Sequence, residues 1–294
     1  MKAGDSMSWE SFSIGGIHLS DFNIYIASTK SGLPNEVFMP SKEIYTSSVA
    51  FQTGEYYWGQ KLNGYEFTLP CIAHEVTEGQ KNQIQQLFNF DKPKPLILDR
   101  RNYRYINVVV SDKIDWNYIW SQLRYNLYSM DIFNGIFELP LYTPDPIWRS
   151  LFDSTDVLGY LEDIDNYPTL YYDLNMPYLE DIPNATQTIT QSPTNLQLFN
   201  GGNIYSLCEI ILIGSGTNIV ITNTTTNQSC TINNMNNETI IIDGNKGQIH
   251  NNISLKTSKF SGNFIKINPN YNDITITGSN LNLTITFKYK YCYL

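Results

Sequence analysis

Few residues in this sequence have the type and spacing needed for catalysis. Asp163 and Asp165 lie close together in a long acidic passage, and such a pair could act as acid and base on a glycoside if their pKa values were set apart. Carboxylates are so frequent in this passage that close pairs arise by chance. We therefore predict no catalytic residue and no enzymatic activity.

The cysteines offer no pattern for a metal or a disulfide framework. They lie far apart in the chain with no Cys-x-x-Cys, and the chain has only three histidines. We expect no metal and no cofactor, and we interpret Cys71, Cys208, Cys230 and Cys292 as small, reduced thiols. Cys292 is predicted to be the most reactive, because chain termini are often exposed.

Two short motifs could bind anions. Arg100, Arg101 and Arg104 could contact a phosphate or a carboxylate, but a turn between two strands is where solvated arginines ordinarily lie. The pair Gly214 and Gly216 does not indicate nucleotide binding, because a phosphate loop needs a following helix and here a strand pattern follows.

The charge distribution excludes further classes of function. No Lys or Arg occurs between Ser150 and Asn245, which contain eleven carboxylates, and no arginine follows Arg149. Specific nucleic-acid binding needs a basic patch with arginines, so we predict none. No stretch approaches eighteen consecutive apolar residues, and no secretory signal pattern is present, so we expect no membrane insertion and synthesis in a cytoplasm.

Residues 51–90 contain the strongest local signals for structure. Residues 54–59 and 65–69 read as strands, and Asn63 with Gly64 could form the tight turn of a hairpin between them. Thr77 and Gln80 have the spacing of a capping box, and Ile84, Leu87 and Phe88 follow at helical spacing. We predict a hairpin followed by a short amphipathic helix, the one substantial helix of the chain.

The length of 294 residues allows two domains. Short strand patterns fill the first half, and two prolines at 144 and 146 close it, so we predict a first domain at 1–150 and a second at 151–294. Residues 151–200 are acidic and rich in tyrosine, and are predicted to be an arm or an irregular loop. From Glu209 onward, apolar and polar residues alternate with period two between Asn- and Gly-rich turns, which predicts an antiparallel sandwich.

Several of these segments, taken in order, resemble the distal tail proteins of long-tailed bacteriophages. In the first half they are GEYYWGQK (54–61), FTLP (67–70), the helix up to Phe90, KPLIL (94–98) and VVVSDKI (108–114). In the second half they are ILIGSGTNI (211–219), NETIIID (237–243) and NLTITF (282–287). Their shared order over most of the chain carries the resemblance. The acidic passage at 151–200 is longer than expected for a minimal member.

The resemblance implies a mainly β fold: an N-terminal β-sandwich with one α-helix that forms a six-membered ring, and a C-terminal galectin-like antiparallel β-sandwich. It implies a structural hub that joins the tail tube protein to the tip (tail-associated) protein and carries peripheral receptor-binding proteins. The expected location is the tip of the virion tail, after assembly in the host cytoplasm.

Three aromatic residues are our candidates for the interface between subunits. Tyr56, Tyr57 and Trp58 are too many to face one inner layer, and aromatics are favoured at interface cores. An alternative is a carbohydrate-binding, lectin-like module, because a similar sandwich occurs in lectins. Sugar sites usually offer an aromatic platform, yet no Trp occurs after Gly201 and the tyrosines gather at 289, 291 and 293, so we favour the structural role.

Overall fold

The structure is a computed structural model that describes residues 10–27, 39–118, 132–156, 182–251 and 253–294. Contacts between residues divide the chain into two compact units. Unit 1 comprises Met1–Trp148 with Leu294, and unit 2 comprises Arg149–Tyr293. The division falls two residues before the boundary that we expected at 150. Within the described ranges, no helix has both the length and the apolar character needed to cross a bilayer.

Unit 1 is built on an antiparallel sheet in which strands distant in sequence become neighbours. The strands are β1 (Phe12–Ile14), β2 (Ile17–His18), β3 (Ile24–Ile26), β6 (Tyr65–Thr77), β7 (Lys94–Leu98), β8 (Arg104–Val110), β9 (Asn117–Tyr118) and β10 (Ile132–Thr143). Their order is β2-β1-β7-β8-β10-β6-β3, with β9 paired to β10. Two short 3₁₀ turns connect strands that follow one another in the chain: η1 (Leu19–Phe22) lies between β2 and β3, and η2 (Asp99–Arg101) between β7 and β8. β11 (Trp148–Ser150) follows at the division between the units.

The sheet curls until its two ends approach one another. The amide of Ile26, in β3, donates to the carbonyl oxygen of Glu10 at 2.8 Å, and the hydroxyl of Ser11 donates to the carbonyl oxygen of Ile24 at 2.8 Å. This curvature brings one face of the strands around a common core. The fully buried side chains of that core include those of Phe12, Ile14, Leu19, Ile24, Leu96, Ile106, Val108, Leu139 and Leu141.

The predicted helix is present as α1 (Glu78–Phe88), the one α-helix among the described residues. Its N-terminus is closed by the predicted capping box, in which Thr77 Oγ1 accepts from the Gln80 amide and Gln80 Oε1 accepts from the Thr77 amide. Ile84, Leu87 and Phe88 are buried on one side. The helix therefore lies against the sheet with a narrow apolar stripe, as its sequence predicted.

The predicted hairpin between residues 54–59 and 65–69 is wrong. The first segment, β5 (Tyr56–Leu62), pairs with β4 (Lys42–Ser47) to form a separate two-stranded sheet, whereas β6 pairs with β10 and β3. Neither Asn63 nor Gly64 has the positive φ that a tight hairpin turn needs. Gly64 instead allows close approach, because a Cβ there would lie 2.4 Å from the Thr143 carbonyl oxygen.

Unit 2 consists of antiparallel strands, three of which are unusually long. These are β15 (Glu209–Asn223), β16 (Gln228–Asp243) and β20 (Asn270–Lys288). They form the centre of the sheet order β12-β20-β15-β16-β17, with β13 also on β20 and β18 on β16. The shorter elements are β12 (Thr186–Ile189), β13 (Thr194–Asn200), β14 (Ser206–Leu207), β17 (Gln248–His250), η5 (Thr257–Lys259), β18 (Phe260–Gly262), β19 (Lys266–Ile267) and β21 (Cys292–Tyr293). β14 pairs with β19.

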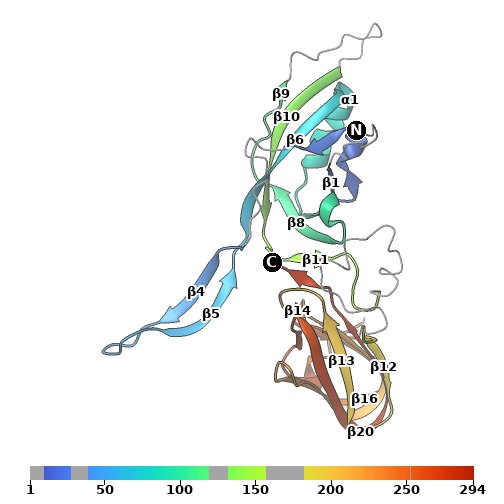
Figure 1. The fold of residues 1–294 in the computed structure, drawn as a ribbon. Coiled ribbons are helices and arrows are strands. Elements are labelled where there is room, and N and C mark those ends of the chain that lie inside the picture. Colours follow the sequence, from blue (N-terminus) through green and yellow to red (C-terminus); the bar gives the residue numbers. More distant parts are fainter. Residues whose placement is uncertain (1–9, 28–38, 119–131, 157–181, 252) are drawn as a thin grey trace, which may run out of the picture. The chain divides into compact units, whose positions relative to one another are not determined.

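The long strands, of which Figure 1 labels β20 and β16, have irregular backbone at paired positions. Gly214 has a φ of +135° and lies opposite Glu238 on one side and Leu283 on the other. Asn237 and Asn280 also have positive φ, and the pairing of β15 shifts in register between Gly214 and Gly216. Gly214 and Gly216 therefore form a bulge within the continuous strand β15, and not one of the glycine-rich turns between strands that the sequence predicted. Bulges and glycines of this kind let one set of strands supply both layers of a sandwich.

The period-two pattern of unit 2 is confirmed. Ile219 and Ile221 are fully buried, while Val220 and Thr222, which follow them in turn, are only partly buried. The same holds for the four apolar residues Leu281, Leu283, Ile285 and Phe287 at the end of β20. The predicted fold class, mainly β with antiparallel sandwiches and one helix, is confirmed.

The passage predicted as an arm or irregular loop is in part a regular sheet. β12 and β13, which lie within 151–200, both pair with β20. Asp153, near the start of the passage, lies 3.3 Å from Lys288 of β20. The acidic pair Asp163 and Asp165 lies outside the described residues.

Candidate assembly surface

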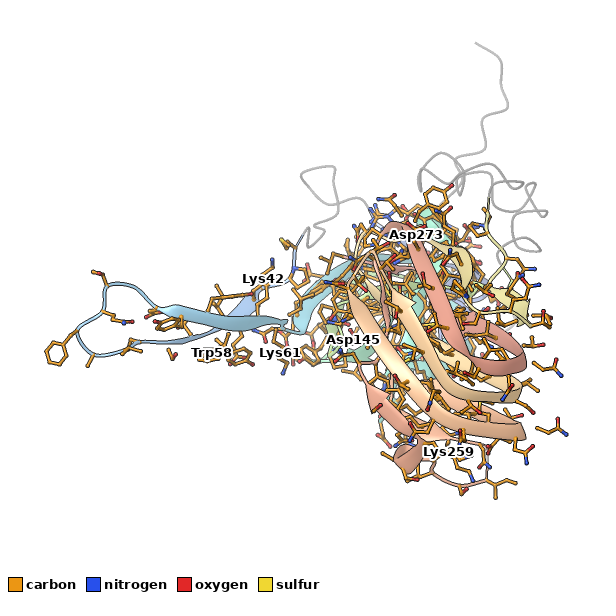
Figure 2. The ribbon with its side chains drawn as sticks, turned by 90° about the horizontal axis from the view of Figure 1, so that it is seen from below. Lys42, Trp58, Lys61, Asp145, Lys259 and Asp273 are labelled. Carbon is orange, nitrogen blue, oxygen red and sulfur yellow. The ribbon has the colours of Figure 1, made fainter. Side chains whose placement is uncertain are left out.

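The β4–β5 hairpin carries the three aromatic residues predicted for an interface. Opposite residues in an antiparallel pair share a face, so Tyr57 lies on the face of Thr46, and Tyr56 lies on the face of Ser47. The pairing passes from Tyr45–Gly59 to Thr46–Tyr57, which leaves Trp58 as the extra residue of a β-bulge. Figure 2 shows Trp58 on this hairpin, with Lys42 and Lys61 on the same two strands.

Hydrogen bonds hold two of these aromatics in place. Trp58 Nε1 donates to Ser47 Oγ at 2.7 Å, which places the indole on the same face as Tyr56. The Tyr56 hydroxyl donates to Gln52 Oε1 at 2.9 Å. These bonds fix side chains that would otherwise be free in solvent, so less conformational entropy remains to be lost when a partner covers them.

Both faces of the hairpin are apolar and exposed. Tyr56, Tyr57 and Trp58 are 53%, 62% and 74% exposed. Of the fifteen large apolar side chains that are exposed in the described residues, seven lie between Ile44 and Trp58: Ile44, Tyr45, Val49, Phe51, Tyr56, Tyr57 and Trp58. Exposed apolar surface concentrated in this way is typical of sites of protein association.

A second feature of unit 1 is an apolar pocket beside α1, with a volume of about 280 Å³. Its walls come from α1, from the end of β8 and the residues after it, and from β10: Lys81, Ile84, Gln85, Phe88, Asn89, Val110, Asp112, Ile114, Trp116 and Phe137. Trp116 stacks on Phe137, with ring centroids 5.3 Å apart, and covers Gly135, where a Cβ would lie 2.1 Å from Trp116 Nε1. The buried Trp116 Nε1 has no acceptor among the described residues.

Unit 2 has a polar groove of about 550 Å³ over β13 and β20. Gln197 Nε2 donates to Asp273 Oδ1 at 2.9 Å, and Thr275 Oγ1 donates to Asn195 Oδ1 at 2.9 Å. Tyr271 lies on the same face one pair further along, is exposed, and contacts the ring of Phe199 at 5.0 Å. Amide, hydroxyl and carboxylate groups thus lie beside one aromatic ring. Sequence reasoning missed Tyr271, because it reaches the face of Asn195 and Gln197 only through the pairing of β13 with β20, which the sequence pattern does not give.

Those terminal tyrosines are buried and unavailable to a ligand. Burial raises the pKa of Tyr291, whose ring packs edge-on against Phe152 and Phe199. The Tyr289 hydroxyl donates to the Phe199 carbonyl oxygen at 2.8 Å. These tyrosines are therefore part of the core of unit 2.

The predicted exposure of Cys292 is wrong. All four cysteines are buried, and the segment around Cys292 is held by hydrogen bonds from the Asn203 and Ile204 amides to its carbonyl oxygen. Burial raises the pKa of Cys230 to about 12 and also raises the pKa of the Cys71 and Cys208 thiols. None of these thiols is prepared for nucleophilic chemistry.

The arginines considered for anion binding have other contacts. Arg100 and Arg101 belong to η2, the predicted turn between two strands, and Arg100 Nε lies 3.3 Å from Glu10 Oε1. Arg104 is buried and places its guanidinium over the ring of Trp148, 5.2 Å from its centroid. No group of three His, Cys, Asp or Glu side chains that could hold a metal occurs in the described part of the chain.

Comparison with known proteins supports the resemblance found in the sequence. Residues 7–121 match a family described as phage tail protein N-terminal domain. The chain has the fold of the SPP1 Dit protein, described as a paradigm of the hub adsorption apparatus in phages that infect Gram-positive bacteria. That match has a TM-score of 0.60 and 13% identity, and covers 96% of this chain and 98% of that one. A chain of the phage P2 baseplate in its activated conformation with calcium matches at a TM-score of 0.40 and 7% identity over 96% and 97%. No curated protein sequence matches the chain.

The family match covers the β4–β5 hairpin, α1 and the pocket beside it up to Trp116. The fold match covers nearly the whole chain, unit 2 included. The resemblance of this chain to the phage distal tail, or hub, proteins is therefore confirmed.

Proposed function

We propose that the chain is a structural hub protein of a phage tail tip or baseplate. In this proposal six copies form a closed ring that joins the tail tube protein to the tip protein and carries peripheral receptor-binding proteins. The protein acts at the tip of the virion tail after assembly in the host cytoplasm. It binds no nucleic acid specifically and catalyses no reaction.

The observation that carries this proposal is the β4–β5 hairpin. A single chain exposes Tyr56, Tyr57 and Trp58 to solvent, together with apolar residues on the opposite face. A ring covers such a surface in every copy at once, because each subunit offers its hairpin to the next one. The likeness of the fold to a phage hub protein supports the same arrangement.

The mass of the full-length protein in solution tests the ring. Native mass spectrometry and analytical ultracentrifugation should give the mass of six chains, and electron microscopy of the same sample should show closed rings. A chain that stays monomeric at tens of micromolar would contradict the proposal.

We place the ring contacts in unit 1 and propose that unit 2 is monomeric by itself. All five tryptophans and the exposed hairpin belong to unit 1, whereas the long strands of unit 2 already cover their own apolar face. Fragments 1–148 and 149–294, expressed separately, should give an oligomer and a monomer. Self-association of the second fragment would show that unit 2 contains contacts between subunits, and would contradict this assignment.

Saccharide binding by unit 2 is a second candidate function. The favouring observation is the β13–β20 groove, where Asn195, Gln197 and Asp273 lie in the same face as the exposed ring of Tyr271. A sugar could stack on the ring and exchange hydrogen bonds with the polar groups. Titration of the full chain with host cell-wall polysaccharide tests it, and the Tyr271→Ala variant should lose saturable binding.

A further inference from the structure

The tip of the β4–β5 hairpin presents an aromatic side chain in an unusual conformation. Phe51 is fully exposed and has a φ of +67°, a backbone region that bulky residues rarely adopt. The amide of Gln52 donates to the Val49 carbonyl oxygen at 3.1 Å and closes the turn around it. A bulky residue held in an unfavourable conformation and away from any core is a candidate for function.

The pocket beside α1 has the size and the walls to receive such a ring. A cavity of about 150 Å³ lined by Leu, Ile and Phe is enough to hold benzene, so about 280 Å³ is ample for a phenyl group and part of its backbone. Ile84, Phe88 and the stacked pair of Trp116 and Phe137 form the apolar part of its lining.

The polar groups of the pocket also match the hairpin tip. The buried indole N–H of Trp116 lacks an acceptor among the described residues, and a hairpin tip carries exposed backbone carbonyl groups that could accept from it. Lys81 lines the pocket together with Asp112; its Nζ donates to the Tyr118 hydroxyl at 2.6 Å and lies 3.9 Å from Glu78 Oε2. Glu55, near the tip, is exposed and makes no ion pair with a described residue, so the charges are complementary.

We propose that Phe51 of one copy inserts into the pocket beside α1 of the next copy, between α1 and Trp116. In this arrangement Trp116 Nε1 donates to a backbone carbonyl of the incoming tip, and Glu55 lies near Lys81. A projecting group and a pocket at different places on one chain form a head-to-tail contact, and such contacts close into rings when the rotation allows it. This inference deepens the proposed ring by naming the two surfaces that meet.

Two variants remove one side of the contact each. Phe51→Ser removes the inserted ring, with Thr53→Ser at the same exposed tip as its matched control. Gln85→Trp fills the pocket from an exposed position of α1, with Gln86→Trp as its control, because Gln86 is also exposed on α1 but does not line the pocket. Neither test variant touches a buried residue, so the fold should be retained, which the helical and sheet signals in circular dichroism would verify.

The oligomer distribution of each variant is measured by mass photometry and ultracentrifugation. We expect the midpoint concentration for assembly to rise at least about tenfold for Phe51→Ser and for Gln85→Trp, and to stay unchanged for the two controls. A one-to-one mixture of the two test variants still contains one intact projection and one intact pocket. At concentrations where neither variant assembles by itself, the mixture should therefore form pairs but not rings.

The failure of this inference is distinct from the failure of the ring. If the wild-type chain forms rings and either test variant forms them at the same concentration, the named contact is wrong and the ring stands. If the wild-type chain is monomeric, both proposals fall.

A photocrosslinking amino acid at position 51 identifies the occupant directly. In a mixture of isotopically light and heavy chains, crosslinks should join position 51 of one chain to residues 81–89 or 110–116 of another. Crosslinks confined to one chain, or to any other region of the second chain, would overturn the inference.

Discussion

The β4–β5 hairpin and the central sheet of unit 2 are both antiparallel and both rich in large apolar residues, yet they differ in what covers them. In β15 and β20, alternate residues such as Ile221 and Ile276 are fully buried and their neighbours face outward. In β4 and β5, side chains on both faces are exposed. Apolar strands with one covered face stabilise their own unit, and apolar strands with neither face covered need a partner.

The largest effect should come from removing a buried side chain of unit 2. Phe287 is fully buried at the end of β20, so Phe287→Ala should lower the free energy of unfolding of unit 2 by about 3–5 kcal/mol. Urea unfolding followed by circular dichroism measures this loss, while tryptophan fluorescence follows unit 1, which contains every Trp of the chain.

The matched control for this change is Ile213→Ala, because Ile213 lies in the same sheet but is exposed. It should change stability by no more than about 0.5 kcal/mol. Equal losses for the two variants would remove the distinction between a covered and an uncovered face.

Truncation of the hairpin aromatics should weaken assembly and not the stability of the single chain. Tyr57→Ala and Trp58→Ala should leave the unfolding of a single chain almost unchanged, because these side chains are mostly exposed, but each should weaken assembly by about 1.5–3 kcal/mol. Sedimentation equilibrium over a range of concentrations measures the second quantity. An assembly that tolerates Tyr56→Ala, Tyr57→Ala and Trp58→Ala would show that the hairpin is not the interface.

Loss of the helix cap should have a smaller effect, confined to unit 1. Thr77→Ala removes the acceptor for the Gln80 amide and should cost about 1 kcal/mol of stability, whereas Thr77→Ser should retain most of it. Thermal unfolding followed by tryptophan fluorescence distinguishes the two. Because α1 also supplies one wall of the pocket, the Ala variant should weaken assembly slightly as well.

The smallest effect concerns an ion pair in unit 2. The hydrogen bond from Lys259 lowers the pKa of Glu238 below its ordinary value, so this pair stabilises the fold above that value and ceases to do so as the pH falls through the folded-state pKa. Glu238→Gln should therefore lower stability by less than about 1 kcal/mol at pH 7, and this loss should shrink as the pH falls through the folded-state pKa of Glu238.

Unfolding of the wild-type chain, Glu238→Gln, Lys259→Met and the double variant at pH 7 and at a series of lower pH values provides the check on the ion pair. A difference in stability between wild type and Glu238→Gln that does not shrink as the pH falls would assign the effect to packing rather than charge.

Local patterns in the sequence were sufficient to predict the elements that depend on residues a few positions apart in the chain. The capping box of Thr77 and Gln80 and the alternation in β20 depend on spacings of two to four residues, and both are present in the structure. The aromatic content of β5 led to the prediction of an interface there, which stays a prediction, but it did not indicate that the tip and both faces would be exposed.

Features that depend on distant residues were not predictable in this way. β5 pairs with β4, and β6 pairs instead with β10, which lies far from it in the chain. The burial of Cys292 and the pocket that gathers Trp116 with Phe137 are set by strand order, which alternation alone does not specify.

The four buried thiols have a consequence for the durability of a released particle. A protein made in a reducing cytoplasm and then carried into oxygenated medium is liable to sulfenic acid formation and to crosslinking between copies. Here every cysteine sulfur is buried, and three of the thiols have raised pKa values, so almost no thiolate is available to an oxidant. Storage in air should therefore leave the cysteines reduced and form no disulfide between copies.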